Sequence, residues 1–161
     1  MSVSYPVASD HQLARLLQIG MVLEEVVEAR AHHHYESLDP AERDAELEAL
    51  LEDAAEESAE HRARLETLVD ELQAEPVAYE EIEKLVAARY ESDRDFDGIL
   101  YDQLCNEETA YKFYDDLIGA IEQSDVAFSI DRDRLLDVLA GIREEEAEGV
   151  EEVTRLMETR A

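Results

Sequence analysis

Apolar residues recur every three or four positions over four long stretches of the chain, which is the spacing of one face of an α-helix. The pattern predicts helices at about 11–37, 40–74, 97–123 and 131–159. Between the second and third, residues 76–96 carry a shorter helical pattern of their own. About two to eight residues are enough to join antiparallel neighbours, so this longer segment predicts a helical crossover. We therefore expect an all-α protein with a single domain over residues 1–161.

The start of the second helix has the strongest local signal in the chain. Asp39 is expected as the N-cap and Pro40 as the first helical residue, and Glu42 would complete a capping box. Pro76 is expected to end this helix region, because the residue before a proline disfavours helical geometry. These signals together predict the boundaries 40–74.

Two glutamates fall inside the apolar stripes. The same spacing, Glu followed by Ala three residues on and Tyr seven residues on, occurs at Glu28, Ala31 and Tyr35 and at Glu107, Ala110 and Tyr114. Residues at these intervals share one helix face, so both carboxylates are predicted to point inward. A buried carboxylate costs roughly several kcal/mol unless a cation, a hydrogen-bond donor or a proton compensates its charge.

The second and fourth stripes also contain residues that are not apolar. Ser58 and His61 interrupt the second stripe, and Glu146 and Gly149 stand at the matching places in the fourth. The first helix thus resembles the third in spacing, and the second resembles the fourth. The pattern is typical of a duplicated helical hairpin joined by the crossover.

The charge balance is strongly acidic. The chain has 43 acidic side chains against 14 basic ones, a net charge of -29, and its lysines are Lys84 and Lys112 alone. Dense surface carboxylates keep a protein solvated when molar salt shortens the Debye length to about 3 Å, so a halophilic source is expected. A hydrophobic fraction of 45% separates the chain from disordered acidic proteins. Without a basic patch, binding to nucleic acid or to an anionic membrane is not expected.

The remaining features predict a cytoplasmic location. Cys105 is the single cysteine, which excludes an internal disulfide, and it is expected to be a small core residue. The sequence has neither a signal-peptide pattern nor an apolar stretch that could span a bilayer. His33 and His34 point to other helix faces than Glu28, and we expect them at the surface or at an interface.

In these residues the chain resembles the ferritin-like superfamily, nearest its rubrerythrin-type branch, over nearly its whole length. That family builds a di-iron or di-manganese site in a four-helix bundle, from a Glu on each of two helices and a Glu-x-x-His motif on each of the other two. The resemblance implies a ferritin-like bundle with iron or manganese as cofactor. By the same resemblance the metal ligands are Glu28, His61, Glu107 and Glu146.

Two positions depart from the family pattern. Ser58 stands where the first motif has its Glu, and Gly149 stands where the second has its His. Other residues of ligand type lie within one helical turn of the expected ones and could supplement the site: Glu24, His32 and Glu57. Alternatively, the same polar side chains form a hydrogen-bonded layer without metal.

The two alternatives imply different functions. A metal-loaded protein would handle iron or defend against peroxide, as a peroxidase or ferroxidase type of oxidoreductase. The family's rubredoxin module with its four cysteines is absent, so a separate electron donor is expected. A metal-free bundle would be a structural or protein-interaction module. The resemblance to small family members implies a homodimer in either case.

Overall fold

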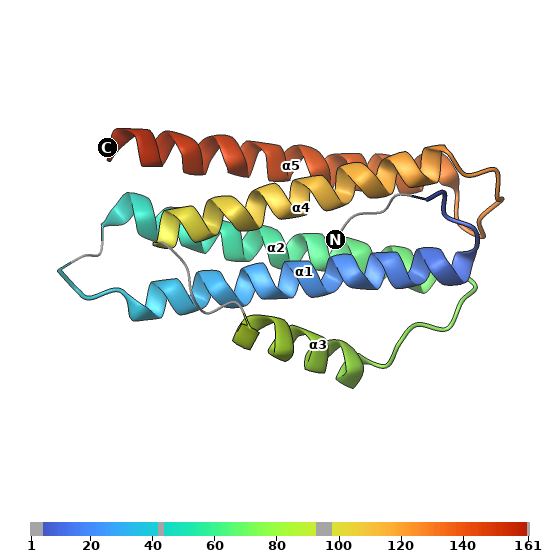
Figure 1. The fold of residues 1–161 in the computed structure, drawn as a ribbon, viewed down its shortest axis with the longest axis horizontal. Helices are drawn as coiled ribbons and strands as arrows, with labels where there is room; N and C mark the ends of the chain where they lie inside the picture. Colours follow the sequence, from blue (N-terminus) through green and yellow to red (C-terminus); the bar gives the residue numbers. More distant parts are fainter. Residues whose placement is uncertain (1–4, 42–43, 93–97, 161) are drawn as a thin grey trace.

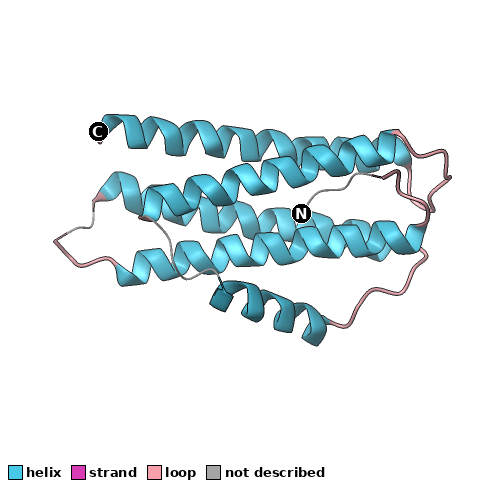
Figure 2. Cartoon of the chain, viewed as in Figure 1, coloured by secondary structure: helices cyan, strands magenta, loops and turns pink. Residues whose placement is uncertain are grey.

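The computed structural model describes residues 5–41, 44–92 and 98–160. The regular secondary structure in these ranges is entirely helical, which confirms the all-α prediction (Figure 2). The helices are α1 (Asp10–Ser37), α2 (Ala45–Glu71), α3 (Tyr79–Ser92), α4 (Ile99–Glu122) and α5 (Arg132–Thr159). None of them is long and apolar enough to cross a membrane.

The four long helices lie side by side, and the short helix α3 lies outside them against α1 (Figure 1). Helix α1 runs antiparallel to α2, and α4 runs antiparallel to α5 (Figure 1). Because α3 carries the chain back along the long axis, α4 runs in the same direction as α2 (Figure 1). All four long helices can therefore contribute side chains to one level of the core.

Side-chain N-caps set where three of the described helices begin, with Ser9 at the start of α1. The predicted start of the second helix at residue 40 is wrong, because Pro40 and Ala41 lie in a turn and α2 begins at Ala45. Asp44 is the N-cap, and its Oδ1 accepts a hydrogen bond of 2.9 Å from the backbone N–H of Leu47. The predicted capping-box residue Glu42 lies outside the described residues. Asp131 caps α5 in the same way.

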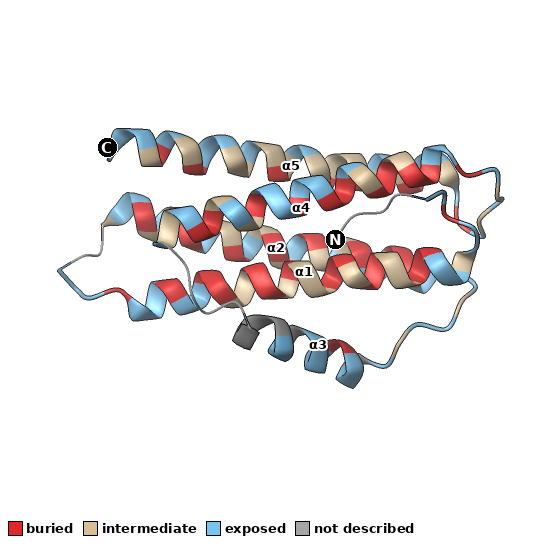
Figure 3. Cartoon of the chain, in the orientation of Figure 1, coloured by how far each residue is buried: buried red, intermediate tan, exposed pale blue. Residues whose placement is uncertain are grey.

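Buried positions line the faces that the long helices turn toward one another (Figure 3). The larger apolar cluster joins α1, α2, α4 and α5 and includes Leu17, Leu65, Leu117 and Leu139. Smaller clusters fill the other end, one of them around Leu51. Between these ends, every long helix places buried polar side chains in the core: Glu24, Ser58, His61, Gln103, Glu107 and Glu146.

The inward face of α1 differs from the expected one. Glu28 and Tyr35 were predicted to point inward, but the Glu28 side chain is 27% exposed and Tyr35 is 39% exposed. Val27 and His34 are buried instead. The buried face runs through residues 24, 27, 31, 34 and 38. From 24 and from 31 it advances by three residues, where the prediction assumed four, and either step stays on one helix face. The repeat around Glu107 is buried as expected, whereas the one around Glu28 is not.

A second cluster of buried polar side chains, Arg30, His34 and Asp102, joins α1 to α4. Nη1 of Arg30 lies 2.6 Å from Oδ1 of Asp102, and Nε2 of His34 lies 2.8 Å from Oδ2 of the same carboxylate. All three residues are buried. The expected surface position is therefore wrong for His34, although His33 is exposed. Cys105 is also exposed, which contradicts its expected place in the core.

Candidate metal centre

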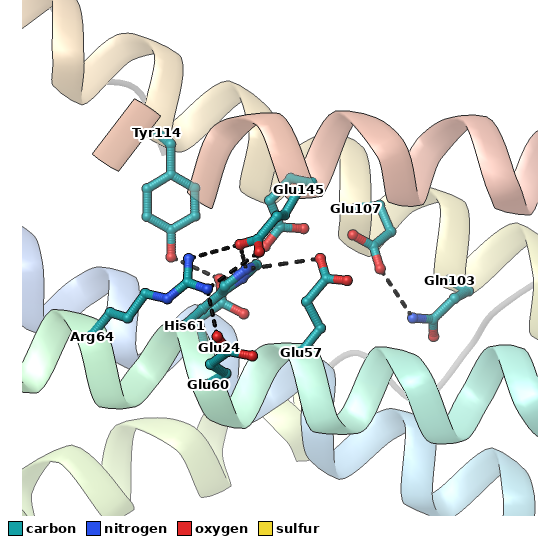
Figure 4. A network of polar contacts seen from close by, with 10 residues as sticks. Glu24, Glu57, Glu60, His61, Arg64, Gln103, Glu107, Tyr114 and Glu145 are labelled. Atoms are coloured by element: carbon teal, nitrogen blue, oxygen red, sulfur yellow. Dashed lines mark hydrogen bonds and ion pairs between the residues drawn. The ribbon is translucent and has the colours of Figure 1, made fainter. Parts of the chain in front are cut away.

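Ligand-type side chains from all four long helices converge at the polar level of the core (Figure 4). One set of donor atoms, all within 4.8 Å of one another, comes from Glu24, His61 and Glu146, and we name it the His61 group. A second set with the same spacing comes from Glu57, Glu107 and Glu146, and we name it the carboxylate group. Glu146 belongs to both, so the two groups are adjacent.

His61 is fully buried and faces carboxylates on both sides of its ring. Its Nδ1 lies 3.0 Å from Oε1 of Glu146 and 3.3 Å from Oε1 of Glu24. Its Nε2 lies 2.8 Å from Oε2 of Glu145 and 3.8 Å from Oε1 of Glu57. Nδ1 is therefore the ring nitrogen that faces the His61 group.

Arg64 holds the outer partner of this imidazole. Its Nη1 donates to Oε2 of Glu145 at 2.8 Å, and its Nη2 donates to Oε1 at 3.2 Å (Figure 4). Burial opposes the charge on Glu145, but hydrogen bonds from Arg64 and His61 outweigh it and lower the pKa of this carboxyl. Metal-ligating histidines commonly donate their second N–H to such a carboxylate, which fixes the tautomer and the ring orientation.

Tyr114 of α4 and Glu24 of α1 form a buried hydrogen bond. The phenolic O–H donates to Oε1 of Glu24 at 2.7 Å. Burial, followed by the charge of Glu24, raises the pKa of Tyr114 well above its ordinary value, so this group stays a donor. Oε2 of Glu24 is buried, and no hydrogen-bond donor among the described residues reaches it. A proton on the neighbouring carboxyl of Glu146 is the one exception.

Glu107 occupies the space that a side chain at position 149 would fill. A Cβ built on Gly149 would lie 2.6 Å from Oε2 of Glu107, closer than real contacts allow. Gln103 donates a long hydrogen bond of 3.5 Å to Oε1 (Figure 4). The buried Oε2 has no partner among the described residues other than a shared proton. The glycine thus gives the Glu107 carboxylate its place in the core.

Three carboxyl groups of the cluster, those of Glu57, Glu107 and Glu146, have a raised pKa. Burial, then the charge of Glu24, raises the pKa of Glu146 far above its usual value, and burial also raises the pKa of Glu107. Burial and the charge of Glu107 raise the pKa of Glu57 to about 7. Burial would lower the pKa of His61, but hydrogen bonding and charge from Glu24 outweigh it and raise this pKa. Negative charge is thus in excess at this level of the core.

Two arrangements can compensate this charge. In the first, Glu146 is protonated and donates its O–H to the carboxylate of Glu107 or of Glu24. In the second, cations take the place of the protons. Four carboxylates, from Glu24, Glu57, Glu107 and Glu146, balance two divalent ions. Metal–ligand bonds of about 2.0–2.2 Å put donors on opposite sides of one ion about 4 Å apart, which the spacing within each group fits.

The structure brings together three of the four ligands expected from the sequence: His61, Glu107 and Glu146. It does not bring in Glu28, whose Oε2 lies 3.9 Å from Nη2 of Arg62. Glu24, one turn earlier, stands in its place. Of the other supplements, Glu57 joins the carboxylate group and His32 is exposed.

Sequence reasoning missed the outer residues of the cluster. Glu145 lies beside the inward stripe of α5 and not in it, yet its side chain is only one-third exposed and contacts both His61 and Arg64. The sequence signal for Arg64 was its place one turn after Glu60, which it also contacts. No pattern on α2 or α5 alone indicates that these two helices meet at Glu145.

No family model matches the chain, and neither the curated proteins nor the solved structures give a match.

Proposed function

We propose that this chain is a ferritin-like, rubrerythrin-type protein that binds two iron or manganese ions and handles iron or peroxide. The observation that carries the proposal is the pair of three-donor groups sharing Glu146 at the centre of four long helices. An acidic cluster alone would be weak support. Here a buried imidazole and two buried carboxylate oxygens, of Glu24 and Glu107, face the same level of the core.

Each residue has a distinct role in this proposal. Glu24 and His61 would hold one ion, and Glu57 and Glu107 the other, with Glu146 between them. Bound iron or manganese would supply the electron transfer that oxygen or peroxide chemistry needs. Tyr114 keeps Glu24 oriented through its hydrogen bond. The apolar clusters on both sides keep bulk water away from the buried members, Glu24, His61, Glu107 and Glu146.

The alternative proposal is a metal-free bundle that serves as a structural or protein-interaction module. One feature favours it specifically, because a protonated Glu146 can donate its O–H to one of its carboxylate neighbours, Glu24 or Glu107. The cluster would then be a hydrogen-bonded polar layer that specifies how the helices pack.

Metal content decides between the two proposals. Protein purified in molar KCl without chelator and reloaded anaerobically with Fe(II) or Mn(II) should contain two equivalents per chain by mass spectrometry. His61→Ala should lose metal, whereas His32→Ala, which changes an exposed histidine, should keep it. Wild-type protein with an intact helical spectrum and no metal above background would support the metal-free module instead.

The family resemblance carries two further expectations. A rubrerythrin-type peroxidase needs a source of electrons, and a separate donor protein is proposed for that role. A homodimer is proposed on the same resemblance, and sedimentation in molar KCl would test it.

A further inference from the structure

We infer that the two metal positions are chemically unequal, so that the protein prefers a mixed pair of ions. The His61 group would take a transition-metal ion with affinity for nitrogen, such as Fe²⁺, and the carboxylate group a harder ion such as Mn²⁺. This inference rests on the proposed function and adds the identity of the ion at each position.

The first observation is the distribution of nitrogen between the two groups. His61 supplies the imidazole of the His61 group, and the Nδ1 side of its ring is the one that faces Glu24 and Glu146. The 2.8 Å contact between Nε2 and Glu145 holds the ring in this orientation. The carboxylate group, in contrast, consists of three glutamates.

The second observation is that α5 supplies no nitrogen donor beside Glu107. Oε2 and the Cδ carbon of Glu107 lie 2.6 and 2.8 Å from where a Cβ at residue 149 would be. No side chain fits there unless Glu107 moves. Gly149 therefore helps to keep the donor atoms of the carboxylate group all oxygen. It does more than mark the loss of the expected histidine ligand.

The third observation is the difference in exposure. Glu24, His61 and Glu146 are all buried, whereas the Glu57 side chain of the carboxylate group is 37% exposed. One partly exposed ligand, Glu57, leaves room for water to complete the coordination shell, and hard cations commonly retain such waters.

These differences in donor type and exposure predict which metal ion each group prefers. Imidazole suits iron, zinc and copper, while carboxylate and water suit magnesium, calcium and manganese. Affinity rises from Mn²⁺ through Fe²⁺ to Co²⁺ at sites of mixed donors. The ratio of Co²⁺ to Mn²⁺ affinity should therefore be higher in the His61 group than in the carboxylate group.

Titration of the metal-free chain with Co²⁺ and Mn²⁺ tests the inference, since Co²⁺ replaces Fe²⁺ without reacting with air. Calorimetry in molar KCl gives the affinities, Co²⁺ absorption reports nitrogen ligation, and Mn²⁺ paramagnetic resonance reports the second position. We expect one ion of each kind per chain when both are supplied. The Co²⁺/Mn²⁺ affinity ratios of the two positions should differ by at least about tenfold.

Variants assign each ion to its group. His61→Ala should weaken Co²⁺ binding at least about tenfold and leave Mn²⁺ binding nearly unchanged, and Glu107→Gln should do the reverse. Gly149→Ala, which displaces Glu107 without removing a ligand, should act like Glu107→Gln. Glu28→Gln is the matched control, because this carboxylate lies outside both groups and should change neither ion.

Two results would overturn the inference. If His61→Ala and Glu107→Gln weaken both ions to the same extent, the positions are equivalent, and the proposed function survives without the mixed pair. If wild-type protein of intact helical content binds neither ion, the proposed function fails as well. Should His61→Ala not fold, Glu57→Gln at the half-exposed edge tests the Mn²⁺ position on its own.

Discussion

The hydroxyl of Tyr114 donates a 2.7 Å hydrogen bond to Oε1 of Glu24, and this bond joins α4 to α1 at the polar level of the core. The donor satisfies one oxygen of a carboxylate that is 1% exposed. The same oxygen lies 3.3 Å from Nδ1 of His61, whereas Oε2 is buried without a hydrogen-bond partner among the described residues. Tyr114 thereby holds Glu24 beside His61 and leaves Oε2 for a cation or a shared proton.

Replacing Tyr114 by Phe should destabilise the metal-free protein. Loss of a buried hydrogen bond to a charged group costs about 1.5–3 kcal/mol. Denaturant unfolding in molar KCl with chelator would measure the change in the free energy of unfolding. Tyr111→Phe on the same helix is the control, since Tyr111 is 39% exposed and its loss should cost at most about 0.5 kcal/mol. Equal effects would mean that the Tyr114–Glu24 bond contributes nothing specific.

Glu24→Gln should abolish binding of the metal ion in the His61 group, whereas Glu28→Gln should not. The amide keeps the size of the side chain but removes the charge that attracts a cation. Metal content after reloading, measured by mass spectrometry, should fall from two equivalents to one in the first variant. The opposite pattern would show that α1 presents the face expected from its sequence and would contradict the geometry of the cluster.

Glu145→Gln should weaken metal binding without removing a ligand. Outer partners of a ligating histidine typically contribute a factor of about 10–100 in metal affinity. Calorimetric titration with Co²⁺ would measure the loss. Glu144→Gln removes an exposed carboxylate from the preceding position and should leave the affinity unchanged. Equal losses in both variants would indicate only the long-range attraction of surface charge.

The metal-free protein should lose stability as the pH rises from about 4.5 through 7. Glu57 has an ordinary pKa of 4.5 that the fold raises to about 7, so its contribution is fully present below 4.5 and is lost above 7. The pKa of His61 is raised from 6.5, and its contribution is lost at still higher pH. Thermal unfolding with chelator, at pH values from 4.5 to 8.5, would record the decline.

Two comparisons isolate the cause of this pH dependence. Glu57→Gln should make the decline between pH 4.5 and 7 shallower, because one carboxyl with a raised pKa is gone while Glu107 and Glu146 remain. Saturating Mn²⁺ should reverse the slope, since ions compete with protons for the same carboxylates. A decline that persists unchanged in Glu57→Gln would show that Glu57 does not cause it and would assign it to the other carboxylates.

Asp102→Asn should destabilise the fold while leaving two metal ions bound. The variant removes the charge that faces both Arg30 and His34 in a buried setting. Breaking a buried ion pair costs about 3–5 kcal/mol. Asp115→Asn, which breaks an exposed pair with Arg143, should cost at most about 1 kcal/mol. Denaturant unfolding and metal analysis of both variants would show whether the cluster around Asp102 acts independently of the metal ligands.

The four helical stripes could be predicted because apolar periodicity reports directly which face a helix buries. The inward residues of α4 and α5, including Glu107 and Glu146, follow this rule. The start of α2 could not be predicted in the same way. Two acids, Asp39 and Asp44, can each cap a helix, and packing decides which of them does.

Choosing between Glu24 and Glu28 needs information that no single helix contains. The two lie one turn apart, and either fits the inward stripe. The rotation of α1 against α2 decides between them, and Arg62 of α2 takes up the outward carboxylates Glu25 and Glu28. The pairing of His61 with Glu145 likewise depends on how two helices meet, and a pattern within one of them carries no such signal.

The half-exposed position of Glu57 has a kinetic consequence. It is the member of the two groups whose side chain reaches solvent, so under the proposed function an arriving ion would meet it first and a departing ion would leave past it. The ion beside Glu57 should exchange quickly, and the ion at His61 should have a much longer residence time. Loading would then proceed from the surface inward, with the outer ion able to leave while the inner one stays.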